Sequence, residues 1–211
     1  MKQHNNKVGK NPGFDIFQLV DVGLYLWMAY CFLKLWVMPT AEDVDRIYFM
    51  SILIAFEFIM VHSGVFMAAM PLKWSLLLFF PVYGLFAFAF NLFVSDNSIL
   101  YLYLGVVLFR MRFAFFNKSK QATDQAIGFS AYAVMVYFIP MIIVAIFSEK
   151  VPEFGVSPEF LEQAGYKIKI GGIFTEMPQT ALCLGACYYI LLALLPILMF
   201  VNSFKAWMKK I

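Results

Sequence analysis

The stretch from Ile47 to Met70, IYFMSILIAFEFIMVHSGVFMAAM, decides the fold class of this chain. It is long enough to cross the hydrocarbon core of a bilayer, which takes about 20 predominantly apolar residues in a helix. Its apolar residues run continuously, whereas the strands of a membrane β-barrel alternate apolar and polar positions. The stretch therefore predicts a membrane-spanning helix that carries two ionisable side chains, Glu57 and His62.

The rest of the chain repeats this pattern. Of its 211 residues, 63% are hydrophobic and 14% are charged, against about 25% charged in soluble domains, and this excludes a soluble protein. At about 20 residues per crossing, the length allows about six helices and no separate soluble domain. The apolar runs of 18 residues or more are Phe14–Val37, Ile47–Met70, Trp74–Val94, Ile99–Phe116, Ile127–Phe147 and Thr180–Phe204. We predict an all-α, polytopic bundle of six transmembrane helices (residues 14–204) between basic tails at residues 1–13 and 205–211.

The basic residues predict how this bundle is oriented. Eleven Lys and Arg residues fall in the two tails, at the inner end of the fourth run and in the segments after the second and fourth runs, and four fall on the other side. Because basic loops stay in the cytoplasm, both termini are expected there, in a bacterial inner membrane or another plasma membrane. The basic start also resembles a secretory signal, but the first run is too long and contains Asp21 and Lys34, so we predict a retained helix. A net charge of +3, scattered along the chain, does not predict nucleic-acid binding.

The longest polar connection, residues 148–179, is expected outside the cytoplasm with a short helix of its own. Ser157 is a candidate N-cap, Pro158 suits the first helical position, and Gly165 is a candidate stop. The segment is interpreted as a structured cover over the helices, and a substrate-gating lid is the alternative. Lys34, at the outer end of the first helix, is expected to reach the acidic residues of the next connection: Glu42, Asp43 and Asp45.

Four ionisable residues fall at one depth near the cytoplasmic side of the predicted bundle. Counted at about 1.5 Å per residue, Asp21, His62 and Arg110 lie in the same layer, as does Arg112. An isolated charge costs about 2.5–3.5 kcal/mol in a membrane helix, so the first three are expected to cluster. Arg112 is expected to reach the lipid headgroups. The cluster is interpreted either as a tie between helices or as a proton or ion relay.

Glu57 is the candidate functional residue with the most exceptional position, because it lies near the bilayer midplane. Such a carboxylate is either protonated and hydrogen-bonded, or ionised and lining a polar path. Gly64 and Ala68 follow at the small-xxx-small spacing that lets helices approach closely. Because Glu57 lies one heptad before Gly64, we expect all three to face a neighbouring helix or subunit.

The sequence lacks the residues that haem sites and multi-histidine metal sites require. Only His4 and His62 exist, so the chain alone cannot supply two histidines from different spans to a haem, and it has no multi-histidine metal centre. We therefore predict no cofactor. The three cysteines, Cys31, Cys183 and Cys187, are expected to be small buried residues. The tyrosine pairs 101/103 and 188/189 are expected in an aromatic belt at the membrane surface.

Two function hypotheses follow. The first is a subunit of a larger homo- or hetero-oligomeric membrane assembly, in contact with the bilayer and with other subunits, and with a structural or supporting role. The alternative is a small proton or cation transporter that uses Glu57 with His62 and Asp21. A membrane enzyme acting on lipid, with the Asp21, His62 and Arg110 layer as its acid or base, is a third possibility, and no catalytic motif supports it.

Overall fold

The computed structural model describes residues 16–69, 74, 77–78, 80–94, 97, 99–101, 103–105 and 120–208, and all regular structure within these ranges is helical. The all-α prediction is therefore confirmed for this part of the chain. The longer helices are α1 (Ile16–Val37), α2 (Val44–Ala69), α4 (Phe80–Asn91), α6 (Lys120–Ile146) and α9 (Pro178–Met208). The short ones are η1 (Ala41–Asp43), η3 (Ser148–Lys150), α7 (Pro158–Gln163) and α8 (Ile173–Glu176).

Three segments are long and apolar enough to cross a membrane: Leu19–Val37, Ile127–Ile146 and Pro178–Leu198. They correspond to the first, fifth and sixth predicted spans, so the chain has the character of a multi-pass membrane protein whose apolar helices suit contact with lipid. The predicted second span coincides with α2, which has 26 residues but also carries Asp45, Arg46 and Glu57.

The structure describes only part of the other two predicted spans. Helix α4 has 12 residues, which extend about 18 Å at 1.5 Å per residue. It is therefore shorter than the predicted run Trp74–Val94 and shorter than the hydrocarbon core of about 30 Å. Most of the predicted fourth span, Ile99–Phe116, lies outside the described residues. Six crossings thus stay a prediction.

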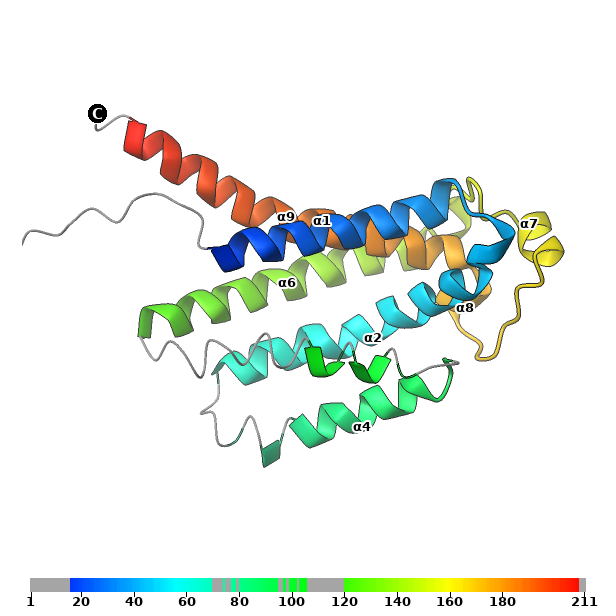
Figure 1. The fold of residues 1–211 in the computed structure, drawn as a ribbon, viewed down its shortest axis with the longest axis horizontal. Coiled ribbons are helices and arrows are strands. Elements are labelled where there is room, and N and C mark those ends of the chain that lie inside the picture. Colours follow the sequence, from blue (N-terminus) through cyan, green and yellow to red (C-terminus); the bar gives the residue numbers. More distant parts are fainter. Residues whose placement is uncertain are drawn as a thin grey trace, which may run out of the picture.

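The long helices lie side by side along the length of the molecule (Figure 1). Helix α1 packs most extensively against α9, and α2 contacts α6, α9 and α4. A core of buried residues from α1, α2, α6 and α9 includes Phe32, Ile54, Tyr137 and Tyr188. A second core lies between α2, α4 and residues 99–103, around Phe56. Helix α2 is thus the element shared by both cores.

The ends of the long helices lie at two opposite ends of the molecule (Figure 1). The start of α1, the start of α6 and the end of α9 lie at one end of the molecule (Figure 1). The turn between α1 and α2 lies at the opposite end with α7 and α8. We call this second end, made of residues 37–46 and 148–179, the loop end.

A close approach between α1 and α9 depends on one glycine. A Cβ atom at Gly185 would overlap the ring of Phe32, which is fully buried, and would lie only 2.6 Å from its Cζ. The Phe32 ring also stacks on Tyr189, with the ring centroids 5.8 Å apart, so it has little room to move away. The predicted close approach at Gly64 and Ala68 concerns side chains outside the described part of the structure. The structure places a tight contact on a different helix.

The short helix predicted in the polar connection is confirmed. Helix α7 begins at Pro158, and the Ser157 hydroxyl accepts a hydrogen bond from the Phe160 N–H at 3.3 Å. Gly165 follows with a φ of 76°, the left-handed conformation that ends many helices. Phe160 and Leu161 pack half-buried against the main core. The connection is therefore attached to the bundle through apolar side chains as well as by the chain itself.

The same connection is seated closely on the end of α1. The Trp36 indole donates a hydrogen bond to the Pro152 carbonyl at 2.7 Å, and the Gly155 N–H donates to the Trp36 carbonyl at 3.1 Å. A Cβ at Gly155 would overlap the ring of Pro39. These contacts favour the interpretation of the segment as a cover over that of a gating lid.

Candidate functional site

Glu57 lies in α2 with only 6% of its surface exposed. The residues on either side of it differ: Phe56 is fully buried, whereas Phe58 is 38% exposed. The carboxylate therefore lies on the face of α2 that packs against other helices, as the sequence predicts. A carboxylate enclosed in this way needs hydrogen-bond partners to offset its desolvation.

Tyr188 of α9 supplies such a partner. Its hydroxyl donates a hydrogen bond to Oε1 of Glu57 at 2.8 Å, and its side chain is fully buried. The ring of Tyr137, from α6, meets the Tyr188 ring edge-on with the centroids 5.3 Å apart. The Tyr137 hydroxyl donates to the Ile54 carbonyl at 2.7 Å. Three helices therefore meet around Glu57, and two of the contacts are hydrogen bonds between different helices.

A third tyrosine makes the same kind of bond nearer the start of α6. The Tyr132 hydroxyl donates to the Leu191 carbonyl of α9 at 2.6 Å. Because backbone carbonyls of α2 and α9 accept from α6 hydroxyls, the bonds fix the rotation of α6 as well as its position. We call Glu57, Tyr132, Tyr137 and Tyr188 the tyrosine tie.

The chemistry available to the tie follows from its enclosure. A carboxyl group accepts a hydrogen bond from a phenol whether it is ionised or protonated, so the Glu57 to Tyr188 bond survives a change of protonation. The side chain is enclosed by packed residues of neighbouring helices. The arrangement is suited to holding helices together.

The sequence does not single out these tyrosines as partners of Glu57. It predicts Tyr188 and Tyr189 at the membrane surface, but they are 0% and 8% exposed, so that prediction is wrong for this pair. Of the other pair, Tyr101 is 70% exposed and Tyr103 is buried. The signal that points to buried tyrosines is the need of each intramembrane hydroxyl for an acceptor, but it does not identify the acceptor.

The other predicted site residues are only partly described. Asp21 lies half-buried in α1, and His62 lies within α2, with its side chain outside the described part of the structure. Arg110 and Arg112 lie outside the described residues altogether. The predicted cluster of Asp21, His62 and Arg110 therefore stays a prediction.

The cysteines differ from what the sequence predicts. All three are free, Cys31 and Cys183 are half-buried, and Cys187 is exposed on α9. The prediction of burial is therefore wrong for Cys187. Its side chain lies on the exposed side of α9, although the next residue, Tyr188, is buried.

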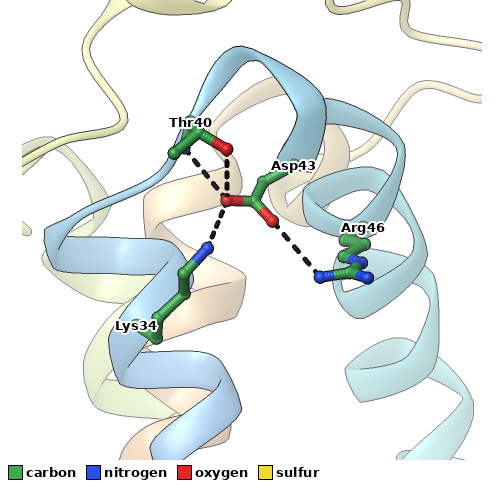
Figure 2. A network of polar contacts seen from close by, with 4 residues as sticks. All are labelled: Lys34, Thr40, Asp43 and Arg46. Atoms are coloured by element: carbon green, nitrogen blue, oxygen red, sulfur yellow. Dashed lines mark hydrogen bonds and ion pairs between the residues drawn. The ribbon is translucent and has the colours of Figure 1, made fainter.

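At the loop end, a second polar network joins α1 to the start of α2 (Figure 2). The Lys34 ammonium forms an ion pair with Oδ2 of Asp43, and that oxygen also accepts from the N–H and the hydroxyl of Thr40 at 3.0 and 2.9 Å. Arg46 lies 3.5 Å from the other carboxylate oxygen. The predicted pairing of Lys34 with an acidic residue of this connection is confirmed, and Asp43 is the one it selects.

These contacts change the acidity of Asp43. Burial by itself would raise the pKa of the carboxyl group, but the hydrogen bonds from Lys34 and Thr40 and the charge of Lys34 outweigh it and lower the pKa from 3.8 to about 2. Asp43 therefore stays ionised at any physiological pH. The network anchors the turn between α1 and α2.

Comparison of the chain with protein families, curated proteins and solved structures finds no match.

Proposed function

We propose that this chain is an integral membrane subunit of a larger homo- or hetero-oligomeric assembly, in which it has a structural or supporting role. The observation that supports the proposal is the environment of the Glu57 carboxylate. The carboxylate predicted near the bilayer midplane accepts a hydrogen bond from the buried Tyr188 and lies among packed side chains. A conducting group would instead need access to a water-filled path.

The outer surfaces of the helices support the same proposal. Large apolar side chains are exposed on α1, including Leu24, Trp27 and Tyr30, and on α6, including Ile139 and Ile143. Such surfaces suit either lipid or the helices of neighbouring subunits. With six crossings and both termini in the cytoplasm, as the basic residues predict, little of the chain would be left for work outside the membrane.

Transport of a proton or cation is the alternative, with Glu57, His62 and Asp21 as its path. One observation favours it: the Tyr188 hydroxyl on Glu57 is a group that can pass a proton along a hydrogen-bonded chain. A path of this kind needs Glu57 to release its proton during each cycle. A supporting role needs only its hydrogen bond.

Glu57→Gln separates the two roles because glutamine keeps a carbonyl oxygen for the Tyr188 hydroxyl but has no acidic proton. The experiment compares the native mass and co-purifying chains of the gently solubilised wild type and variant, and then proton flux in liposomes. For a supporting subunit, both proteins assemble with the same partners in fixed stoichiometry, and neither raises the flux above that of empty liposomes. Tyr188→Phe is the companion variant, and we expect it to weaken assembly more than Glu57→Gln does.

A contrary result is equally clear. Wild-type protein that runs alone and conducts protons above the empty-liposome rate, with the excess lost in Glu57→Gln, would overturn the subunit role and establish transport. A matched control is Glu176→Gln, which removes an exposed carboxylate at the loop end and is expected to change neither readout.

A further inference from the structure

A cavity of about 220 Å³ opens at the loop end between the first turn of α2 and the segment that follows α7. Its lining includes Asp45, Tyr48, Tyr166, Lys167 and Lys169. Cavities that hold drug-sized ligands measure about 300–1,000 Å³, so this one suits a smaller chemical group. We call it the Asp45 pocket.

The charged side chains that line the Asp45 pocket form no ion pairs with one another. The ion pairs among the described residues join Lys34 and Arg46 to Asp43, and neither includes Asp45, Lys167 or Lys169. All three side chains are exposed. The pocket therefore offers two ammonium groups that can bind an anion, with a single carboxylate beside them.

The floor of the pocket is aromatic and rigid. Tyr48 is 95% buried, being 5% exposed, and its ring lies 6.2 Å from that of Tyr166. The Tyr166 hydroxyl is held by the Thr175 carbonyl at 3.0 Å. The Lys169 ammonium lies over the Tyr48 ring, 5.3 Å from its centroid, an arrangement that orients the cation. One lysine is therefore positioned before any ligand arrives.

The pocket lies at the level where the candidate membrane spans end. Helix α2 contacts α8, and α8 ends at Glu176, just before the candidate span Pro178–Leu198. The neighbouring span of α1 ends at Val37, at the same end of the molecule (Figure 1). Tyrosines and lysines at this level are typical of the headgroup region of a bilayer. A lipid headgroup would reach the pocket without leaving the membrane surface.

We propose that the Asp45 pocket binds a phosphoethanolamine group, with Lys167 and Lys169 on the phosphate and Asp45 on the primary ammonium. Two cations and one carboxylate match a ligand that carries both charges, whereas Asp45 would repel a purely anionic headgroup. A quaternary choline ammonium cannot donate a hydrogen bond to Asp45, and the Tyr48 ring that could otherwise hold it is occupied by Lys169. The ligand is either the headgroup of a membrane lipid or a soluble molecule with the same group. This site is independent of the proposed subunit role.

The test uses the purified full chain in mild detergent and native mass spectrometry of bound lipid. The protein is incubated with equal amounts of phosphatidylethanolamine, phosphatidylcholine and phosphatidylglycerol that share the same acyl chains. We expect the first lipid to be retained about tenfold more than either of the others, since a charge-assisted contact is gained only with it. Soluble glycerophosphoethanolamine is then titrated as a competitor to distinguish the two sources.

The variants separate the two halves of the ligand. Asp45→Asn is expected to abolish the preference for ethanolamine over choline while leaving phosphate-dependent retention. The double variant Lys167→Gln and Lys169→Gln is expected to reduce the retention of phosphatidylethanolamine and of phosphatidylcholine about tenfold. The controls are Glu162→Gln and Lys150→Gln, exposed residues of the loop end that do not line the pocket. Thermal unfolding of each variant identifies any that fails to fold.

Each outcome bears on the proposal. Preferential lipid retention that Asp45→Asn removes supports the pocket with a lipid as ligand, and binding of the soluble competitor without lipid retention supports it with a soluble ligand. Equal retention of the three lipids together with no binding of the competitor overturns it. A preference that persists in folded Asp45→Asn overturns the assigned role of the carboxylate and with it the proposal.

Discussion

The carboxylate of Asp43 at the loop end finds its partners close in the sequence, whereas the carboxylate of Glu57 inside the bundle finds its partner far away. Asp43 is three residues from Thr40 and nine from Lys34. Glu57 is 131 residues from Tyr188, and Tyr137 is 83 from the carbonyl it bonds. At the loop end the chain reverses, so nearby residues meet and water is available to unpaired groups. Inside the bundle, the long side chains of Glu57 and Tyr137 carry their polar ends away from their own helix, so these ends meet groups on neighbouring helices.

The two regions should therefore respond differently to substitution. Loss of a contact at the loop end is partly offset by water, while loss of a contact in the interior leaves a cavity, a clash or an unpaired group. Four substitutions test this difference, from the largest expected effect to the smallest.

Gly185→Ala should have the largest effect because its Cβ would overlap the buried Phe32 ring. We expect the free energy of unfolding to fall by about 2–3 kcal/mol, the usual cost of overfilling a packed core. Reversible unfolding in mixed micelles measures it. Gly23→Ala and Gly128→Ala are matched controls, since a methyl group at either position in those helices would meet nothing within 4 Å; they should be stabilising by about 0.5–1 kcal/mol. Equal effects at all three sites would contradict the tight α1 to α9 contact.

Tyr188→Phe removes the hydroxyl that Glu57 accepts from and changes little else. We expect a loss of about 1–3 kcal/mol, because a buried carboxyl group loses a hydrogen-bond donor. The same unfolding experiment measures it, with Tyr30→Phe as the control on an exposed tyrosine. A loss no greater than that of the control would mean that the Glu57 contact does not hold the helices together.

Asp43→Asn tests the polar network of the loop end through pH. Because the pKa of Asp43 is lowered from 3.8 to about 2, its contribution is complete above pH 3.8 and is lost as the pH falls through about 2. At pH 7 we expect the substitution to cost about 1 kcal/mol, and the difference between wild type and variant should shrink between pH 4 and pH 2. Thermal unfolding across this range measures it, with Glu149→Gln as an exposed control. A difference independent of pH would contradict the ion pair as its cause.

Ser157→Ala should have the smallest effect, since it removes one N-cap from a helix of six residues. The expected cost is about 0.5 kcal/mol, at the low end for N-caps. Hydrogen exchange of the Phe160 amide should rise while exchange in α9 stays unchanged. Ser157→Asp, which keeps a capping oxygen, is the control, and faster exchange throughout the bundle would show that α7 is more tightly coupled to the core than its packing indicates.

Part of the candidate site could be predicted from the sequence. The position of Glu57 on an interior face followed from its place in a long apolar run. The pairing of Lys34 with one of the three acidic residues of the next connection followed from their proximity across a turn, and the structure selects Asp43. The partner of Glu57 could not be predicted, because nothing in α2 specifies which helix it meets. The residue type of Tyr188 predicts a place at the membrane surface, and only packing against Tyr137 places it inside.

By itself the sequence determined the helical membrane class, the beginning of α7 at Pro158 and the presence of an ion pair across the turn between α1 and α2. These features depend on composition and on residues a few positions apart, so they are local. Only the tertiary structure decided that Gly185 receives the Phe32 ring and that Tyr188 meets Glu57. Both depend on which helices are neighbours and how each is rotated about its axis, and packing of the whole bundle sets those quantities.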